Sequence, residues 1–428
     1  MDGSISLAYK RMAVILDTEV TVMLSTKVDF NQELIMNWHF SDKAMNTTTS
    51  IIREILKMAS QPGIINFGGG MPAPELFPNA EVKDAACRAI EKYGPPMMQY
   101  SLTQGVPPLR EKIAERFSKI NDIDVSGDAV QITSGSQQGL DMIGRAFLNP
   151  GDYVLTERPT YLGALQAFGF YEVKYCTAEL ESDGICIEEA EEQIKKYSPK
   201  LIYVVPDFQN PAGISMAVEK REALVELSRK YQIPIVEDNP YSELRFSGEA
   251  KPSIQSLGGS SVINLGTFSK TISPGLRIGF LVGCPDVMRM IEKVKQGNDL
   301  HTNTFTQYVL LEYLESGHLD NFHIDVLRRE YGQRRDTMIR TMEKEFPPDV
   351  KFTRPTGGLF LWVTLPEHVS TTDMFQKAVD AGVAYVPGKP FYPHGDVDRD
   401  FRINFCNATE ENIIKGVERL GEVFRLVL

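Results

Sequence analysis

Short apolar runs rich in β-branched residues alternate with longer amphipathic stretches between Phe67 and about residue 285. The runs that define this alternation are LIYVVP (201–206), IPIVED (233–238), SVINLGTF (261–268) and GFLVGC (279–284). Between the first two lies MAVEKREALVELSRKYQ, whose apolar residues recur near helical spacing. Strands that are apolar on both faces are typical of a parallel sheet covered by helices on each side. The pattern therefore predicts an α/β fold with a largely parallel sheet.

The pattern changes after about residue 290. Long amphipathic helices follow, including VLRREYGQRRDTMIRTMEKEF, and then a glycine-rich strand pair, PTGGLFLWVTL. A last strand, FRINFC, precedes a C-terminal helical stretch. This order of elements predicts a second, smaller α+β domain.

Composition excludes several classes of protein. The 428 residues are enough for two domains, and a formal net charge of −12 gives no basic surface for nucleic acid or for an anionic membrane. No apolar run approaches the ~18 residues of a membrane span. The five cysteines form no CxxC pair, which favours free thiols in a cytoplasmic protein. The six histidines lack metal-ligand spacing, so no metal site is expected.

Polar side chains follow three of the expected strands. Asn210 comes after LIYVVPDFQ, Asp238 ends IPIVED, and Lys270 follows INLGTFS. Ligands of open α/β sheets bind beyond the carboxyl ends of the strands. An amide, a carboxylate and an amine at neighbouring strand ends therefore predict a binding site.

Lys270 has surroundings that suit chemistry. A lysine is a nucleophile only after its amine loses a proton, which burial or a nearby cation such as Arg277 promotes. The hydroxyl groups of Thr267 and Ser269, together with that arginine, also suit a phosphate group.

A second hydroxyl-rich turn occurs in ITSGSQQGLDMIG (132–144). It reads as a strand followed by a helix N-terminus, where the N–H groups of Ser136 and Gln137 would favour an anion. A plain helix cap is the alternative for this turn on its own.

A phosphorylated aldehyde cofactor reconciles these features. Pyridoxal phosphate needs a Schiff-base lysine, an anion cradle and a carboxylate that keeps its pyridine nitrogen protonated. Asp238 suits that carboxylate, and Asn210 and Tyr241 could hydrogen-bond the phenolic oxygen of the ring. Tyr161 offers a face for stacking on the ring.

With these residues in place, the chain resembles the fold-type-I, pyridoxal-phosphate-dependent aminotransferases of class I/II from about Ser50 to its C-terminus. The matching segments are FGGGMPAPELFP, MQYSLTQGVPPLRE, TSGSQQGL, PTYLGALQAF, FQNPAG, VEDNPY, GTFSK with PGLRIG, KQGNDLHTN, PTGGLFLWV, YVPGKPF and FRINF. The resemblance implies a large domain with a mostly parallel seven-stranded sheet and a smaller α+β domain. It implies residues 66–315 for the large cofactor-binding domain, 316–428 for the small domain and 46–65 for an arm near the active site. No role is assigned to the extension 1–45.

The resemblance also implies the roles of the site residues. Lys270 would carry the cofactor as a Schiff base and move the proton of the substrate α-carbon in a ping-pong reaction. Asp238 would pair with the pyridine nitrogen. The remaining cofactor contacts would be Asn210 and Tyr241 at the phenolic oxygen, Tyr161 on the ring, and Ser136, Gln137, Thr267, Ser269 and Arg277 at the phosphate.

Other matched positions imply a homodimer and a substrate site. Tyr100 would reach the phosphate held by the other subunit, so that the two active sites are shared. Arg402 in FRINF would bind the substrate α-carboxylate bidentately, and Gly70 would lie where the backbone passes the substrate. Asn210, Tyr100 and Tyr161 would also border the substrate.

Within the class, the GGGMPAPELFP opening and the SIIREIL stretch most resemble the kynurenine/2-aminoadipate aminotransferases, the LysN-like group. That likeness would place Arg53 on a helix near the substrate side chain, where a cation could pair with a distal carboxylate. The alternative is that Arg53 is a solvated helix residue. We expect broad specificity, with glutamate and 2-oxoglutarate as one couple and 2-aminoadipate or an aromatic amino acid as the other.

Two other functions remain open on sequence grounds. A β-lyase or a decarboxylating synthase on the same fold would use the same lysine and aspartate. A transcription regulator with an aminotransferase-like domain would need a winged helix-turn-helix, and no recognition helix stands out before Ser50.

Overall fold

The computed structural model describes residues 38–46, 61 and 63–428. The chain divides into two units, Met1–Met45 and Asn46–Leu428. In the first unit the described residues include most of a short helix, α2 (Asp42–Asn46). Most of the expected arm 46–65, including Arg53, lies outside the described residues. The second unit contains all the elements considered next.

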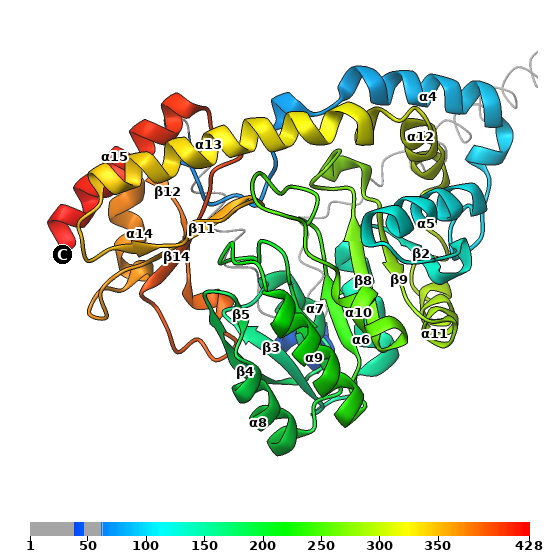
Figure 1. Cartoon of the computed structure of the whole chain (residues 1–428), viewed down its shortest axis with the longest axis horizontal. Helices are drawn as coiled ribbons and strands as arrows, with labels where there is room; N and C mark the ends of the chain where they lie inside the picture. Colours follow the sequence, from blue (N-terminus) through cyan, green and yellow to red (C-terminus); the bar gives the residue numbers. More distant parts are fainter. Residues whose placement is uncertain (1–37, 47–60, 62) are drawn as a thin grey trace, which may run out of the picture. The chain divides into compact units, whose positions relative to one another are not determined.

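The larger sheet has eight strands in the order β2-β9-β8-β7-β6-β3-β4-β5 (Figure 1). The strands are β2 (Val130–Thr133), β3 (Tyr153–Arg158), β4 (Lys174–Glu181), β5 (Gly184–Ile185), β6 (Leu201–Val204), β7 (Ile235–Asp238), β8 (Val262–Thr267) and β9 (Gly279–Val282). The pairs from β8 through β7, β6 and β3 to β4 are parallel, whereas β9 is antiparallel to both of its neighbours. The sheet is therefore mostly parallel, as expected. The expected seven strands are joined by an eighth, the two-residue β5, which folds back antiparallel on β4.

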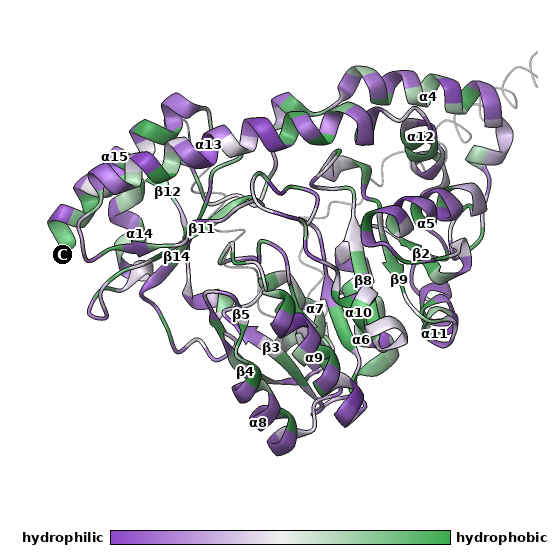
Figure 2. Ribbon diagram, in the orientation of Figure 1, coloured by the Kyte–Doolittle hydropathy of each residue, from purple (hydrophilic) through white to green (hydrophobic). Residues whose placement is uncertain are grey.

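Alternate residues of the central strands point to opposite faces of this sheet and enter two separate cores. Val154, Tyr203 and Val236 belong to the core that contains α6 (Ser136–Phe147), α7 (Leu162–Gly169) and α11 (Pro285–Gln296). Leu155, Ile202 and Ile235 belong to the core with α8 (Ile187–Tyr197), α9 (Val218–Tyr231) and α10 (Ile254–Gly258). Because side chains alternate along a strand, a continuous apolar run is what helices on both faces require. Figure 2 shows apolar strands with polar residues on the outward sides of α8 and α9.

A third core lies at the β2–β9 end of the sheet. Apolar residues of α4 (Asn79–Tyr93), α5 (Pro107–Asn121) and α12 (Thr304–Glu315) pack there with Val130, Ile132 and Val282 of the strands. Helix α5 packs against β2, α12 packs on α5, and α4 packs on α12 (Figure 1).

The C-terminal part forms the expected α+β arrangement. Its antiparallel sheet has the order β10-β11-β14-β13, and a parallel pair joins β1 to β12. The strands are β1 (Ile65–Asn66), β10 (Lys351–Phe352), β11 (Phe360–Thr364), β12 (Val383–Ala384), β13 (Val386–Pro387) and β14 (Asp400–Asn404). The helices are α13 (Ile324–Glu345), α14 (Thr371–Asp380) and α15 (Glu410–Val427). Short 3-10 turns occupy Pro74–Leu76, Pro95–Met98, Gly127–Ala129, Gly259–Ser261, Pro274–Leu276 and Lys389–Phe391, and a π-helical turn, Leu319–His323, leads into α13.

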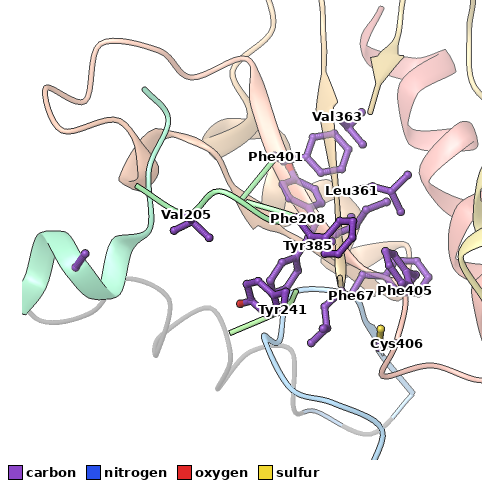
Figure 3. Close-up of a cluster of buried hydrophobic side chains, with 14 of the residues drawn as sticks. Phe67, Val205, Phe208, Tyr241, Leu361, Val363, Tyr385, Phe401, Phe405 and Cys406 are labelled. Carbon is purple, nitrogen blue, oxygen red and sulfur yellow. The ribbon is translucent and has the colours of Figure 1, made fainter. Parts of the chain in front are cut away.

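One apolar cluster joins the two sheets (Figure 3). Val205, Phe208 and Tyr241 come from the loops that follow β6 and β7. They belong to the same core as Leu361 on β11 and Phe401 on β14. Because close-packed interiors move little, this cluster fixes the strand ends of the large sheet against the small sheet. Side chains that reach one site from both sheets are therefore held at fixed positions relative to one another.

Candidate active site

A cleft of about 380 Å³ opens at the carboxyl ends of β6, β7 and β8. It is lined by most of the residues predicted from the sequence, namely Gly70, Ser136, Gln137, Tyr161, Asn210, Asp238, Tyr241, Thr267, Ser269, Lys270, Arg277 and Arg402. Tyr100 does not line it, and Arg53 lies outside the described residues. Sequence reasoning gave no role to several other lining residues, which are Leu162, Gly163, Gln166, Val205, Pro240, Pro274, Phe360 and Phe391.

Lys270 stands just beyond the carboxyl end of β8. Its Nζ donates a hydrogen bond of 2.7 Å to the carbonyl oxygen of Gly70. Burial, and then the nearby guanidinium of Arg402, lower the pKa of the Lys270 ammonium to about 8. A neutral amine is therefore accessible near physiological pH, which a nucleophile or a proton acceptor requires.

Asp238 is the last residue of β7 and is only 3% exposed. Its Oδ2 accepts a hydrogen bond of 2.7 Å from the hydroxyl of Tyr203, and its Oδ1 is buried without a partner. Burial raises the pKa of this carboxyl to about 7, although the Tyr203 bond and the charge of Lys270 both lower it. A buried acceptor without a partner costs free energy, so Oδ1 is suited to a donor that enters the cleft. The sequence did not single out Tyr203, because one tyrosine within a buried strand looks like core.

Asn210 connects the large sheet to the small one. Its Oδ1 accepts a hydrogen bond of 2.8 Å from Arg402 Nη1, and its Nδ2 donates to Tyr241 Oη at 3.4 Å. Burial raises the pKa of the Tyr241 phenol well above its usual value, so this hydroxyl stays protonated and can itself donate. Tyr161, whose pKa burial raises to about 12, stands on the same cleft at the start of α7.

The N-terminus of α6 forms one end of the cleft. Gly135 caps this helix at φ +80°, in the left-handed region that favours glycine. A Cβ at Gly135 would lie 2.3 Å from Arg277 Nη2, so only glycine lets the arginine approach the turn. Arg277 Nη2 donates to the carbonyl oxygen of Ser134 at 3.3 Å. The cation and the helix N-terminus therefore face the same space, which suits an anion.

Two hydroxyl groups complete this end of the cleft. Thr267 Oγ1 donates to Ser269 Oγ at 3.0 Å, and the backbone N–H of Ser269 donates to Thr267 Oγ1 at 3.2 Å. The predicted phosphate residues are thus gathered on one side, with Ser136 and Gln137 from α6.

Arg402 reaches the cleft from β14 and is almost fully buried. Its Nη2 donates to the carbonyl oxygen of Gly68 at 2.9 Å, and its Nε has no partner. The guanidinium carbon lies 4.3 Å from the ring centroid of Phe360 and 5.2 Å from that of Phe391. Burial lowers the pKa of this group to about 10, so it remains a cation at neutral pH. Aromatic rings on a planar guanidinium fix its orientation without consuming its hydrogen-bond donors.

The arrangement fits pyridoxal phosphate. The partnerless Asp238 Oδ1 offers an acceptor for a protonated ring nitrogen, and the glycine-permitted turn with Arg277 offers an anion cradle. Lys270 places an amine on the same cleft. A model of the family described as "Aminotransferase class I and II" matches residues 63–420.

The chain belongs to the class I and II aminotransferases. This aminotransferase has the fold-type-I architecture and depends on pyridoxal phosphate. Aromatic-amino-acid aminotransferase 1 of Thermococcus litoralis is 44% identical to it over 90% of this chain and 94% of that protein.

Two solved structures are similar to the aminotransferase. Kynurenine aminotransferase of Pyrococcus horikoshii, in complex with PMP, superposes with a TM-score of 0.88 at 44% identity and covers 91% of this chain and 97% of its own. LysN, the α-aminoadipate aminotransferase of Thermus thermophilus, gives a TM-score of 0.84 at 37% identity and covers 91% and 97%. The sequence-based prediction of a class I/II aminotransferase close to the kynurenine and 2-aminoadipate enzymes is confirmed.

Proposed function

We propose that this aminotransferase exchanges amino groups between glutamate and 2-oxoglutarate on one side and 2-aminoadipate or an aromatic amino acid on the other. The observation that carries the proposal is the position of Lys270 and Arg402 on one cleft, linked through Gly68–Gly70 and Asn210. The relatives named above act on aromatic amino acids, kynurenine and α-aminoadipate according to their names, which supports this substrate range.

We assign to Arg402 the role of binding the substrate α-carboxylate. It is a buried cation with aromatic rings beside it, and it makes one hydrogen bond from each Nη to a neutral acceptor, Asn210 Oδ1 or the Gly68 carbonyl. A carboxylate is a stronger acceptor for a guanidinium than an amide or a carbonyl oxygen. An amino acid therefore gains charge-assisted hydrogen bonds to Arg402 that an amine without a carboxylate lacks.

Lys270 is assigned the movement of the substrate proton. Its lowered pKa leaves a neutral amine available to accept the α-proton and then to return it on the other side of the transfer. The Gly70 carbonyl holds this amine at the cleft through the 2.7 Å hydrogen bond.

Pyridoxal phosphate supplies the electron sink that makes the α-proton acidic when it is bound. Asp238, oriented by Tyr203, is assigned to hold a proton on the ring nitrogen, and Asn210 and Tyr241 to donate to the phenolic oxygen. Tyr161 is assigned to the ring face. The phosphate is assigned to Ser136, Gln137, Thr267, Ser269 and Arg277.

The protein is proposed to act as a homodimer with shared sites. Tyr100 is 80% exposed, lies outside the cleft of its own chain and meets His301 edge-on at 5.8 Å between ring centroids. Met98 and Leu102 beside it are also exposed. An aromatic side chain with apolar neighbours on a surface is suited to a protein interface.

The position of the eight-stranded sheet before residue 315 and of the sheet β10-β11-β14-β13 after it supports the following division of the chain. We assign residues 66–315 to a large cofactor-binding domain, 316–428 to a small domain and 46–65 to an arm that would bring Arg53 to the substrate side chain. A cytoplasmic location is proposed, because all five cysteines are unpaired. No helix among the described residues is long and apolar enough to cross a membrane.

A donor–acceptor matrix tests the substrate assignment. Purified holoenzyme is given each amino acid with 2-oxoglutarate, and both the glutamate and the new 2-oxo acid are quantified. Equal amounts of the two products are expected with 2-aminoadipate or with an aromatic amino acid. The proposal fails if 2-oxoglutarate accepts no amino group from any of these donors. Release of 2-oxo acid without glutamate would identify a lyase instead.

A further inference from the structure

A fully buried lysine, Lys295, pairs with the partly exposed Asp299 behind the turn that opens the anion end of the cleft. Lys295 is on α11 with its side chain 0% exposed, and its Nζ donates to Asp299 Oδ1 at 2.5 Å. The same ammonium donates to Thr302 Oγ1 at 3.2 Å and to Gln138 Oε1 at 3.1 Å. All three of its protons therefore have acceptors, and neither Lys295 nor Asp299 lines the cleft.

These contacts converge on Ser134, the residue before Gly135. The Ser134 hydroxyl donates to Asp299 Oδ2 at 3.1 Å, and its N–H donates to Gln138 Oε1 at 2.7 Å. Its carbonyl oxygen accepts from Arg277 Nη2. Each polar group of Ser134 is thus fixed, two of them by residues that Lys295 orients and the third by the arginine of the cleft.

Stability alone is a poor reason for such a pair. Taking the Lys295 ammonium out of water is costly, and its attraction to the partly exposed Asp299 roughly offsets that cost without a large net gain. The pair does give directional bonds that an apolar contact cannot give. Here Lys295 donates to Gln138 in the first turn of α6, and Asp299 accepts from Ser134 in the turn that precedes this helix.

We propose that Lys295 and Asp299 are positioning residues that hold the Ser134–Ser136 turn and Arg277 in the geometry that binds the cofactor phosphate. This inference rests on the proposed phosphate site. The physical route runs from Lys295 through Asp299 and Ser134 to Arg277, with a branch through Gln138. Loss of the pair leaves the phosphate ligands present but misaligned, so that phosphate recognition weakens while the ring and substrate contacts remain.

The test compares two forms of the cofactor. Dissociation constants of pyridoxal phosphate and of unphosphorylated pyridoxal are measured on cofactor-free protein by fluorescence quenching. In the variant Lys295→Met with Asp299→Asn, which leaves no unpaired charge, pyridoxal phosphate is expected to bind about tenfold or more weakly, the usual value of a charge-assisted hydrogen bond, with pyridoxal unchanged. Lys293→Met, an exposed position on the same helix, is the matched control.

Ser134→Ala gives a milder variant in case the double variant does not fold. It removes only the bond from the turn to Asp299 and Thr302, and a smaller change in the same direction is expected. A merely structural role would lower the unfolding temperature without altering the ratio of the two affinities. An unchanged ratio in both variants overturns the proposal.

Arg277→Gln separates this inference from the proposed site. If Arg277→Gln changes the affinity ratio and the Lys295 and Ser134 variants do not, the phosphate site stands and the positioning role is wrong. If Arg277→Gln also leaves the ratio unchanged, the phosphate is bound elsewhere and both assignments fall.

Discussion

Tyr203 donates a hydrogen bond to Asp238 across two neighbouring parallel strands, and this one bond decides which carboxylate oxygen is left without a partner. Oδ2 is occupied by the phenol, so Oδ1 is the oxygen left for a ligand. The phenol also lowers the pKa of a carboxyl that burial raises. Tyr203 therefore orients Asp238 and favours its charged form at the same time.

Tyr203→Phe should reduce activity most on the acid side of the pH profile. Removing the donor raises the pKa of Asp238 above about 7, so a smaller fraction is ionised at neutral pH. Since we propose that the carboxylate form holds a proton on the cofactor ring, the acid limb of kcat/KM should move to higher pH, and activity should recover toward pH 9. Rates measured from pH 5.5 to 9.5 check this, and an acid limb at the wild-type position would contradict it.

Lys270→Met should stabilise the cofactor-free protein at pH 7, while abolishing transfer. The Lys270 pKa falls from 10.5 to about 8 on folding because the amine is buried, so the folded state holds this charge less well than the unfolded state. Wild-type stability therefore rises between about pH 8 and 10.5 as the unfolded chain releases its extra proton. The advantage of the variant should be full at pH 7 and nearly gone at pH 10.5.

Thermal unfolding of both proteins at pH 7, 8.5 and 10 measures this effect. Lys293→Met, which changes an exposed lysine on α11 in the same way, is the control. A difference in unfolding temperature that is the same at pH 7 and pH 10 would show that burial of the Lys270 charge is not its cause.

Gly135→Ala should weaken binding of pyridoxal phosphate by about tenfold or more, because the new methyl displaces Arg277 and a charge-assisted hydrogen bond is worth about 1.5–3 kcal/mol. Gly151→Ala provides a matched control. Gly151 also has a positive φ, of 85°, but a Cβ there meets nothing within 4 Å. Both variants place a Cβ on a residue with positive φ, so equal losses of affinity would mean that the contact with Arg277 is irrelevant.

Arg402→Lys should lower kcat/KM for amino acids by about 10- to 100-fold, mainly through KM. A lysine keeps the charge but cannot reach Asn210 and the Gly68 carbonyl together or stack between Phe360 and Phe391. Steady-state kinetics with several donors measure the loss. Binding of pyridoxal phosphate should be nearly unchanged, and a comparable loss there would place Arg402 at the cofactor instead.

The sequence was sufficient to predict that Asn210, Asp238 and Lys270 line one cleft. Asn210, Asp238 and Lys270 follow parallel strands, and the carboxyl ends of such strands share one edge of the sheet. The local sequence pattern was therefore enough to predict that these three side chains lie on the same cleft. The helices on both faces were likewise implied by apolar runs that lack alternation.

Other features had no local signal. β9 runs antiparallel because the connection from Thr267 to Gly279 holds no helix long enough for a parallel crossover. β5 is too short to show a periodicity. Phe360 and Phe391 lie within motifs that match the family, but the sequence indicates no role for them. Their contact with Arg402 brings together three separate segments of the small domain, which no local pattern can reveal.

Gly70 is a position at which selectivity for substrate size can be engineered. Its carbonyl holds Lys270, yet there is room for a Cβ on its own Cα: the nearest neighbours would be Phe360 at 3.7 Å and Arg402 at 3.9 Å. Those are ordinary van der Waals distances, and its φ is not in the left-handed region. Gly70→Ala would therefore trim the substrate space by one methyl group while leaving every charged group in place. A library that varies position 70 would change substrate size preference separately from catalysis.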